Sequence, residues 1–400
     1  MKISPTRISR RAEAVTPFYA MEFGKRAAEL EAAGHDVVKL SIGEPDFGAP
    51  PAFLAAIAEL TDGRPLTYTG ALGLPELRSA IAGFTRDHFG ADIDPGRVVV
   101  TSGASAALLL CCAALIDPGD EVLVADPSYP CNRRFAESFG ARVRLVGTTP
   151  ETRYQLTAGL VDEAWSPDTR GVMVATPSNP TGTSIPFDEL VRLCTGVDSR
   201  GGWRIVDEIY LGLSDPTADG GGPRSILTAD PGAIVINSFS KYFGMTGWRL
   251  GWCIAPDELV PVLERLAQNY YICAPTPAQF AALECFTPDS LALAEARRAE
   301  YRIRRELVLD GLRRIGLPVP VIPDGAFYVY VDVSATGLTA GDFCDRALRE
   351  AHVSLTPGMD FGEQTADTHI RLSYSASADE PSEGLRRLGE FVGGLPAVSS

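Results

Sequence analysis

One lysine and one arginine stand eight residues apart in a segment otherwise rich in aromatic residues and glycine, SFSKYFGMTGWRLG (238–251). A lysine in apolar surroundings loses hydration, which lowers its pKa and leaves more of the neutral amine. The neutral amine attacks carbonyl groups and forms a Schiff base. Lys241 is therefore a candidate nucleophile, although a surface lysine at the start of a loop would give the same pattern.

Groups that bind a phosphate lie near this lysine in the sequence. The Arg249 guanidinium can hold a phosphate through two parallel hydrogen bonds, and the hydroxyls of Ser238 and Ser240 can bind the same anion. The segment SGAS (102–105) stands between a predicted strand and a predicted helix, where free backbone N–H groups and the helix dipole attract anions. An imine-forming lysine beside a phosphate site indicates pyridoxal 5′-phosphate (PLP) as the cofactor.

Three further polar residues suit the ring of that cofactor. Asp207 ends the apolar run WRIVD, and its carboxylate could pair with the pyridine nitrogen, so that the ring accepts electrons from a substrate carbanion. Asn179 in PSNPTG and Tyr210 in DEIY could both bind the phenolic oxygen. Taken singly, Asp207 could be a helix cap and Asn179 an ordinary turn residue.

Short apolar runs alternate with helical stretches or loops from residue 97 onward. Runs with little polar alternation predict a mostly parallel sheet whose two faces are covered by helices. Such a sheet binds its ligand at the carboxyl ends of its strands. The polar residues at those predicted ends are Ser102, Asp126, Asn179, Asp207 and Ser238.

A long charged helix, predicted at 291–315, separates this part from a second region. There FYVYVDV and HIRLSYS look like strands of a smaller, partly antiparallel sheet. We therefore expect an α/β fold, with a large PLP-binding domain (47–288) built on a seven-stranded, mostly parallel sheet and a smaller α+β domain (1–46 and 289–400). No G-x-G-x-x-G follows a strand, so a dinucleotide-binding fold is not supported.

Composition limits the partners and the compartment. Acidic residues exceed basic ones by 51 to 36, giving a net charge of −15 that disfavours nucleic acid and anionic membranes. The eight cysteines form no C-x-x-C and no Cys/His cluster, so we expect no metal site and a reducing, cytoplasmic location. The longest apolar run, 104–116, is too short to span a bilayer, and the N-terminus lacks the apolar core of a signal peptide.

Eight motifs together resemble one family along nearly the whole chain. In the order of the family, they are SIGEPDF, YTGALGLPELRSAI, SGASAAL, DPSYP, PSNPTG, DEIY, SFSKYFGMTGWRLG and HIRLSYS. This set is similar to the class I aminotransferases, PLP enzymes of the aspartate-aminotransferase fold (fold type I). The resemblance implies transamination between an L-amino acid and a 2-oxo acid, with 2-oxoglutarate as the expected acceptor. It also implies a homodimer with active sites shared between subunits.

The resemblance assigns a role to each candidate residue. Lys241 would form the Schiff base and move the substrate proton, with Asp207 on the pyridine nitrogen and Asn179 and Tyr210 on the phenolic oxygen. The remaining implied roles are the phosphate site (Gly103, Ala104, Ser105, Ser238, Ser240, Arg249), ring stacking (Tyr129), the substrate site (Gly43, Asn179, Arg371) and the phosphate of the neighbouring subunit (Tyr68).

The motifs leave two alternative functions and the identity of the amino donor open. The same residues would serve a carbon–sulfur β-lyase or another enzyme that forms a Cα carbanion. The PLP-binding half of a transcription regulator is a further alternative, but residues 1–40 show no helix-turn-helix. Ser105 stands where some bacterial aspartate aminotransferases of this subgroup have a lysine for a distal carboxylate, and 274–277, near the side-chain pocket, offers no cation. We therefore expect a neutral donor, namely alanine or an aromatic or other apolar amino acid.

Overall fold

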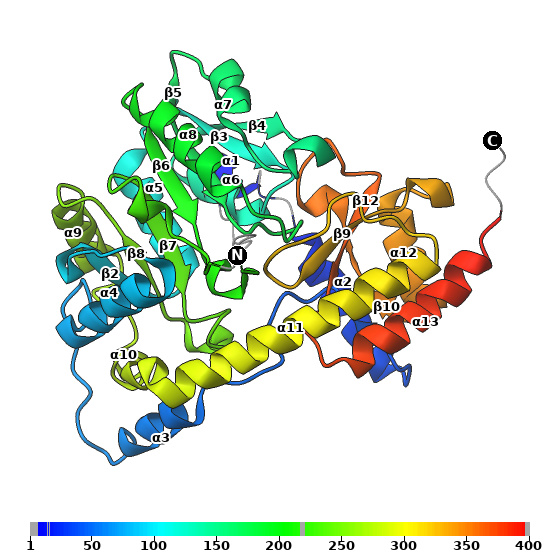
Figure 1. Ribbon diagram of the computed structural model, residues 1–400, viewed down its shortest axis with the longest axis horizontal. Helices are drawn as coiled ribbons and strands as arrows, with labels where there is room; N and C mark the ends of the chain where they lie inside the picture. The colour runs from blue at the N-terminus through cyan, green and yellow to red at the C-terminus, as the bar shows by residue number, and fades with distance from the viewer. Residues whose placement is uncertain (1–6, 14, 16, 217–220, 397–400) are drawn as a thin grey trace, which may run out of the picture.

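The central sheet has seven strands, as predicted, and forms the middle of the larger part of the molecule (Figure 1). The computed structural model describes residues 7–13, 15, 17–216 and 221–396. In space the strands follow the order β2-β8-β7-β6-β5-β3-β4. The strands from β7 to β4 run parallel, whereas β8 is antiparallel to both β7 and β2, so the expectation of a mostly parallel sheet is confirmed. Their bounds are β2 (Val98–Thr101), β3 (Glu121–Asp126), β4 (Arg142–Gly147), β5 (Thr169–Ala175), β6 (Trp203–Asp207), β7 (Ile234–Ser238) and β8 (Gly251–Ile254).

Helices cover both faces of this sheet because its strands are apolar on both sides. Along β3, Val122 and Val124 point into one hydrophobic core and Leu123 into the other, as the two-residue period of a strand requires. The helix after β2 contains no charged residue, which suits its buried position against the sheet. One face carries α5 (Ala104–Leu115), α6 (Pro130–Ser138) and α9 (Val260–Tyr270), and the other α4 (Pro75–Phe89), α7 (Ala158–Ala164) and α8 (Phe187–Asp198).

The smaller part of the molecule combines segments from both ends of the chain. Its three-stranded antiparallel sheet has the order β11-β12-β9, and β1 pairs in parallel with β10 in a separate two-stranded sheet. The strands are β1 (Val38–Lys39), β9 (Tyr328–Asp332), β10 (Val353–Ser354), β11 (Thr356–Pro357) and β12 (His369–Ser373). The exact domain limits, 47–288 against 1–46 and 289–400, stay a prediction.

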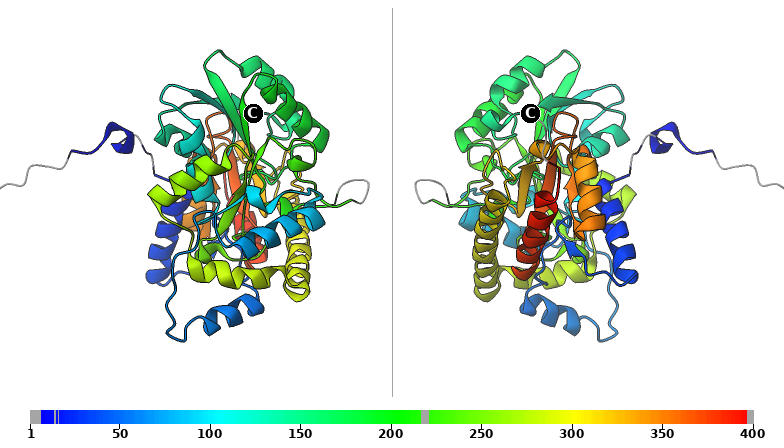
Figure 2. Two further views of the ribbon diagram at one scale, coloured as in Figure 1. Left: turned by 90° about the vertical axis from the view of Figure 1, so that its left-hand side faces the viewer. Right: turned by 90° about the vertical axis from the view of Figure 1, so that its right-hand side faces the viewer.

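One helix connects the two parts. α11 (Pro288–Arg314) has 27 residues and extends from the larger part of the molecule along the smaller part (Figure 1). Figure 2 shows α11, α13 and α12 side by side on the outside of the smaller part, with α2 beyond them. The remaining helices are α1 (Arg10–Glu13), α2 (Tyr19–Ala32), α3 (Pro51–Glu59), α10 (Thr276–Ala281), α12 (Ala340–Glu350) and α13 (Asp379–Gly393).

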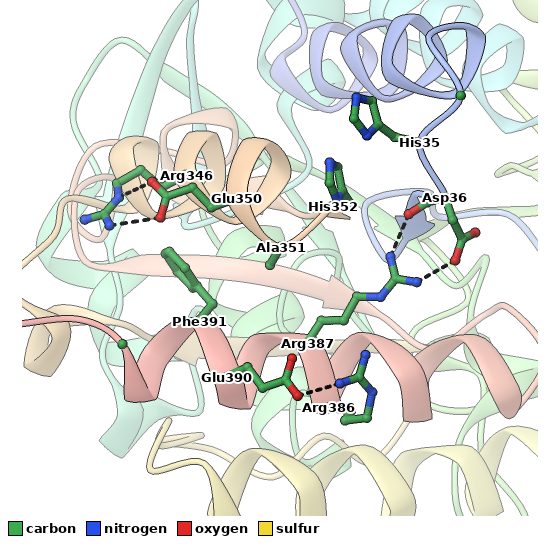
Figure 3. A pocket seen from close by; sticks show the side chains of 12 residues that line it. His35, Asp36, Arg346, Glu350, Ala351, His352, Arg386, Arg387, Glu390 and Phe391 are labelled. Carbon is green, nitrogen blue, oxygen red and sulfur yellow. Dashed lines mark hydrogen bonds and ion pairs between the residues drawn. The ribbon is translucent and has the colours of Figure 1, made fainter.

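An open pocket of about 700 Å³ lies where the end of α2 meets α12 and α13 (Figure 3). The rings of His35 and His352 stack there with their centroids 4.5 Å apart. Arg387 binds both the carbonyl and the carboxylate of Asp36, and the other two arginines that line the pocket bind glutamates of their own helices. The contact between Arg387 and Asp36 links α13 to the connection between α2 and β1.

Candidate active site

A second pocket, of about 540 Å³, lies between the large sheet and the smaller part, at the carboxyl ends of β5 and β6 and beside the turn that follows β7. It brings together most of the residues that the sequence singles out. Gly103 and Ser238 lie directly behind its lining, and Tyr68 lies outside it with 74% of its surface exposed. The predicted residues that line it are Gly43, Ala104, Ser105, Tyr129, Asn179, Asp207, Tyr210, Ser240, Lys241, Arg249 and Arg371.

Lys241 extends from the turn after β7 into this pocket. Its Nζ donates to the carbonyl oxygen of Gly43 at 2.7 Å, and the rings of Tyr210 and Phe327 lie 5.8 and 5.6 Å away. Burial lowers the pKa of Lys241 to about 8; Glu44 opposes this shift, whereas Arg371 adds to it. The amine therefore has the reduced pKa that the sequence predicts for a nucleophile.

The backbone at Gly43 is shaped by a residue that the sequence did not single out. A Cβ at position 43 would lie 2.1 Å from the hydroxyl oxygen of Tyr328, so only glycine lets the loop approach this closely. The same hydroxyl lies 2.9 Å from that of Tyr210. Tyr328 starts β9, where the sequence predicts only a strand, and its place in the site depends on contacts made across the whole chain.

Asp207 ends β6 with its carboxylate buried at the base of the pocket. Its Oδ1 accepts from the backbone N–H of Ile209 at 3.0 Å. Burial raises the pKa of Asp207 to about 7, against the opposing effects of that N–H and of Lys241. A buried carboxylate with so few donors favours a proton or a cationic ring nitrogen as its partner.

Arg371, in β12, is 3% exposed and forms no ion pair with any residue in the described ranges. Nη1 donates to Asn179 Oδ1 at 2.9 Å, and Nη2 donates to the carbonyl oxygen of Ser41 at 2.6 Å, while the buried Nε has no partner. The guanidinium lies 4.6 and 5.0 Å from the rings of Tyr328 and Phe361. A buried cation without a counter-charge indicates a site for an anionic group of a ligand.

Polar groups line the pocket on the side of α5. Ser238 Oγ donates to Ser240 Oγ at 2.8 Å and accepts from the N–H of Ser240 at 2.9 Å. The Arg249 guanidinium lies against Gly103, where a Cβ would come within 2.6 Å of Nη2 and where φ is +85°. Because α5 starts at Ala104 without a side-chain cap, its first N–H groups face the same place. Hydroxyls, a guanidinium and a helix N-terminus together suit a phosphate.

The aromatic and apolar lining adds two features. Tyr129, at the start of α6, meets the edge of the Phe18 ring with centroids 6.4 Å apart, and burial raises its pKa well above the usual range. Phe18 and Met21, at the start of α2, and Ile42 complete the more exposed part of the lining. The sequence does not single out these three residues: Phe18 and Met21 belong to no motif, and Ile42, inside SIGEPDF, has no polar group that marks it, so all three are placed at the pocket only by the folded chain.

In the described part of the chain, no group of three or more His, Cys, Asp or Glu side chains is arranged to hold a metal ion. None of its helices combines the length and the apolar character needed to cross a membrane.

Comparisons with known proteins agree with this geometry. The family model for aminotransferase class I and II matches residues 35–388. A valine–pyruvate aminotransferase of Mycobacterium tuberculosis is 41% identical over 388 residues, which cover 96% of this chain and 98% of the relative. The crystal structure of an aminotransferase from Mycobacterium tuberculosis superposes with a TM-score of 0.92 at 40% identity, covering 97% of this chain and 99% of the other. For the aspartate aminotransferase of Thermus thermophilus with maleate, the TM-score is 0.90, the identity 34% and the coverage 96% and 99%.

Proposed function

The chain belongs to the class I and II aminotransferases, which use PLP, and we propose that it moves the amino group of an apolar L-amino acid to a 2-oxo acid. We propose an apolar donor because Phe18, Met21 and Ile42 line the more exposed part of the pocket. An apolar side chain gains free energy by leaving water for such a surface, and an anionic one loses hydration without a cation to pair with.

The pocket offers no spare cation for a second carboxylate. Of the described residues that line it, the cationic ones are Lys241, Arg249 and Arg371, and each has another role below. Ser105, where a lysine would mark an aspartate-type enzyme, is uncharged. The relative named for valine and pyruvate supports an apolar donor and makes pyruvate a candidate acceptor beside 2-oxoglutarate.

The side chains around the pocket fit PLP. When bound, PLP supplies an aldehyde that condenses with amines and a ring that draws electrons from the substrate Cα. Asp207 would pair with its ring nitrogen, because this buried carboxylate is otherwise short of donors. Asn179 and Tyr210 would contact the phenolic oxygen, and Tyr129 would lie against the ring face. The residues proposed to bind the phosphate are Gly103, Ala104, Ser105, Ser238, Ser240 and Arg249.

We assign two tasks to Lys241. Its amine would hold the cofactor in the resting enzyme, and when free it would accept the substrate Cα proton at Nζ and later donate that proton again. A pKa of about 8 suits this exchange because both protonation states are populated near neutral pH. The carbonyl of Gly43, 2.7 Å from Nζ, would keep the amine directed into the pocket between the two tasks.

We assign the substrate carboxylate to Arg371. Its bonds to Asn179 and Ser41 would fix the plane of the guanidinium before the substrate arrives, and the rings of Tyr328 and Phe361 lie against it. Asn179 accepts from Arg371 through Oδ1, which leaves its Nδ2 group as a donor for the phenolic oxygen. One amide would therefore connect the substrate site to the cofactor site.

The proposed homodimer explains the position of Tyr68. This tyrosine is 74% exposed and lies outside the pocket of its own chain, as a residue that serves the neighbouring subunit would. We propose that its hydroxyl binds the phosphate in the partner's site, so that each site needs two chains. We also propose a cytoplasmic location, supported by eight cysteines that are all free thiols.

The test is a panel of L-amino acids offered with pyruvate or 2-oxoglutarate, with products read by mass spectrometry. We expect valine, leucine, alanine and aromatic donors to give their 2-oxo acids together with the aminated acceptor. Faster turnover of aspartate or arginine than of every apolar donor would overturn the proposed donor class. Release of pyruvate and ammonia from cysteine conjugates, without an aminated acceptor, would instead indicate the β-lyase reaction.

A further inference from the structure

The N-terminus of α2 is capped by a residue from the other end of the chain. Phe18 occupies the N-cap position and has no side chain that could accept from the first turn. Instead, the Asp360 carboxylate accepts from the N–H of Tyr19 at 2.8 Å and from that of Ala20 at 3.0 Å. A carboxylate in this position satisfies free N–H groups and interacts favourably with the helix dipole.

The same end of α2 forms part of the active-site lining. Phe18, Ala20 and Met21 all line the pocket, and the Phe18 ring contacts Tyr129 edge-on. Met21 is 68% exposed, so packing holds its side chain only weakly. The position of this apolar wall therefore depends on what holds the backbone of the first turn.

Asp360 stands on a turn that is fixed from two sides. The turn η8 (Gly358–Asp360) follows β11, and the ring of the next residue, Phe361, lies 5.0 Å from the Arg371 guanidinium. The carbonyl oxygen of Phe361 accepts from the N–H of Ser128 at 2.8 Å, one residue before Tyr129.

Asp126, at the end of β3, holds the residues that follow this turn. Its carboxylate accepts from the N–H of Glu363 at 2.9 Å and from that of Gln364 at 3.2 Å. The turn that carries Asp360 is thus tied both to the proposed carboxylate site and to the large sheet.

We propose that Asp360 is a positioning residue that seats the start of α2 over the pocket and thereby sets the preference of the enzyme among apolar donors. This inference rests on the proposed function, because it concerns the wall that the donor side chain would contact. Asp360 is 4% exposed, and burial raises its pKa against the opposing effects of the two N–H groups, Arg371 and Arg133. The carboxylate is thus committed to α2 rather than to water.

The test compares Asp360→Asn and Asp360→Ala with Asp379→Asn, which changes an exposed first-turn carboxylate of α13 away from the pocket. Hydrogen exchange reads the first turn of α2 directly. We expect the amides of Tyr19 and Ala20 to exchange roughly 2- to 30-fold faster in Asp360→Ala, the fold-change that corresponds to loss of an N-cap. Asp360→Asn keeps one acceptor oxygen and should give a smaller increase, and Asp379→Asn should give none.

Selectivity is the second readout. In the Asp360 variants we expect the ratio of kcat/KM for leucine to kcat/KM for alanine to fall roughly tenfold, because the longer side chain loses more contact with the wall. In a Phe18→Ala/Met21→Ala background, Asp360→Ala should change that ratio by less than about threefold, since the wall is already absent.

The possible results distinguish failure of the proposed function from failure of the proposed role of Asp360. A wild-type enzyme that transaminates no apolar donor would overturn the proposed function. A wild-type enzyme that does so, with Asp360 variants that keep both the selectivity ratio and the slow exchange of α2, would overturn only the role of Asp360. If Asp360→Ala does not fold, hydrogen exchange and the selectivity ratio are measured on Asp360→Asn instead, because asparagine retains the shape of the side chain.

Discussion

Replacing Arg371 by lysine tests the proposed substrate site most directly. The exchange keeps a positive charge but removes the planar pair of donors that binds a carboxylate through two hydrogen bonds. Loss of one charge-assisted bond costs about 1.5–3 kcal/mol, which corresponds to a roughly 10- to 150-fold lower kcat/KM. Arg371→Ala leaves the substrate carboxylate buried without a partner, at a cost of about 3–5 kcal/mol, or roughly 150- to 5,000-fold.

The assay compares an apolar amino acid with the amine that has the same side chain but no carboxylate. We expect the loss only with the amino acid, because the amine has nothing for Arg371 to bind. Because Arg371→Ala removes a buried charge that forms no ion pair among the described residues, this variant should leave Tm unchanged or raise it.

Arg305→Lys is the matched control for this experiment. Arg305 is a buried arginine of α11 that binds Asp215 and does not line the pocket. An equal loss of kcat/KM for the amine and the amino acid in Arg371→Lys, or the same loss in Arg305→Lys, would refute the assignment.

Three other predictions concern the cofactor side of the site. Lys241→Ala should abolish turnover. In the wild-type apoprotein, the neutral amine of Lys241 prevails only above its pKa of about 8. The rate of PLP binding should therefore rise as the pH approaches 8 and level off above it. Stopped-flow absorbance measures this rate, and a rate independent of pH would contradict the lowered pKa. Gly43→Ala should lower Tm and slow PLP binding, because its Cβ would lie 2.1 Å from the Tyr328 hydroxyl. Calorimetry measures the Tm, and the same absorbance assay measures the binding rate. An unchanged Tm would mean that the loop moves freely. Tyr68→Phe should weaken PLP retention by roughly 10- to 150-fold through loss of one hydroxyl–phosphate bond, measured by dialysis and fluorescence, and full retention would exclude Tyr68 from the partner's site.

The sequence predicted the strands of the large sheet well because each is a short apolar run followed by a turn signal. It also placed Asn179, Asp207 and Ser238 near one another, since parallel strands end at the same edge of a sheet. The structure brings Asn179 and Asp207 into one pocket, with Ser238 directly behind its lining. Position along the sheet was therefore accessible from local patterns alone.

Contacts between distant segments were not accessible in this way. Nothing around Asp360 indicates that its carboxylate caps a helix 340 residues earlier in the chain. Tyr328 reads as an ordinary strand aromatic until Gly43 comes against its hydroxyl. Such contacts depend on how segments far apart in the chain come together in space, which no periodicity encodes. The role of Tyr68 and the domain limits depend in the same way on tertiary or quaternary arrangement, and they remain predictions.

The pairing of β1 with β10 has a consequence for biosynthesis. Val38 pairs with Val353, so β1 cannot form its sheet until 315 more residues have been translated (353 minus 38). At typical elongation rates this takes roughly 15–60 s. The large sheet can close once Ile254 has left the ribosome, whereas Arg371 emerges more than a hundred residues later (371 minus 254 is 117). The proposed substrate residue is therefore translated well after Asp207, Lys241 and Arg249, the residues proposed for the cofactor, so the two halves of the site cannot be completed together.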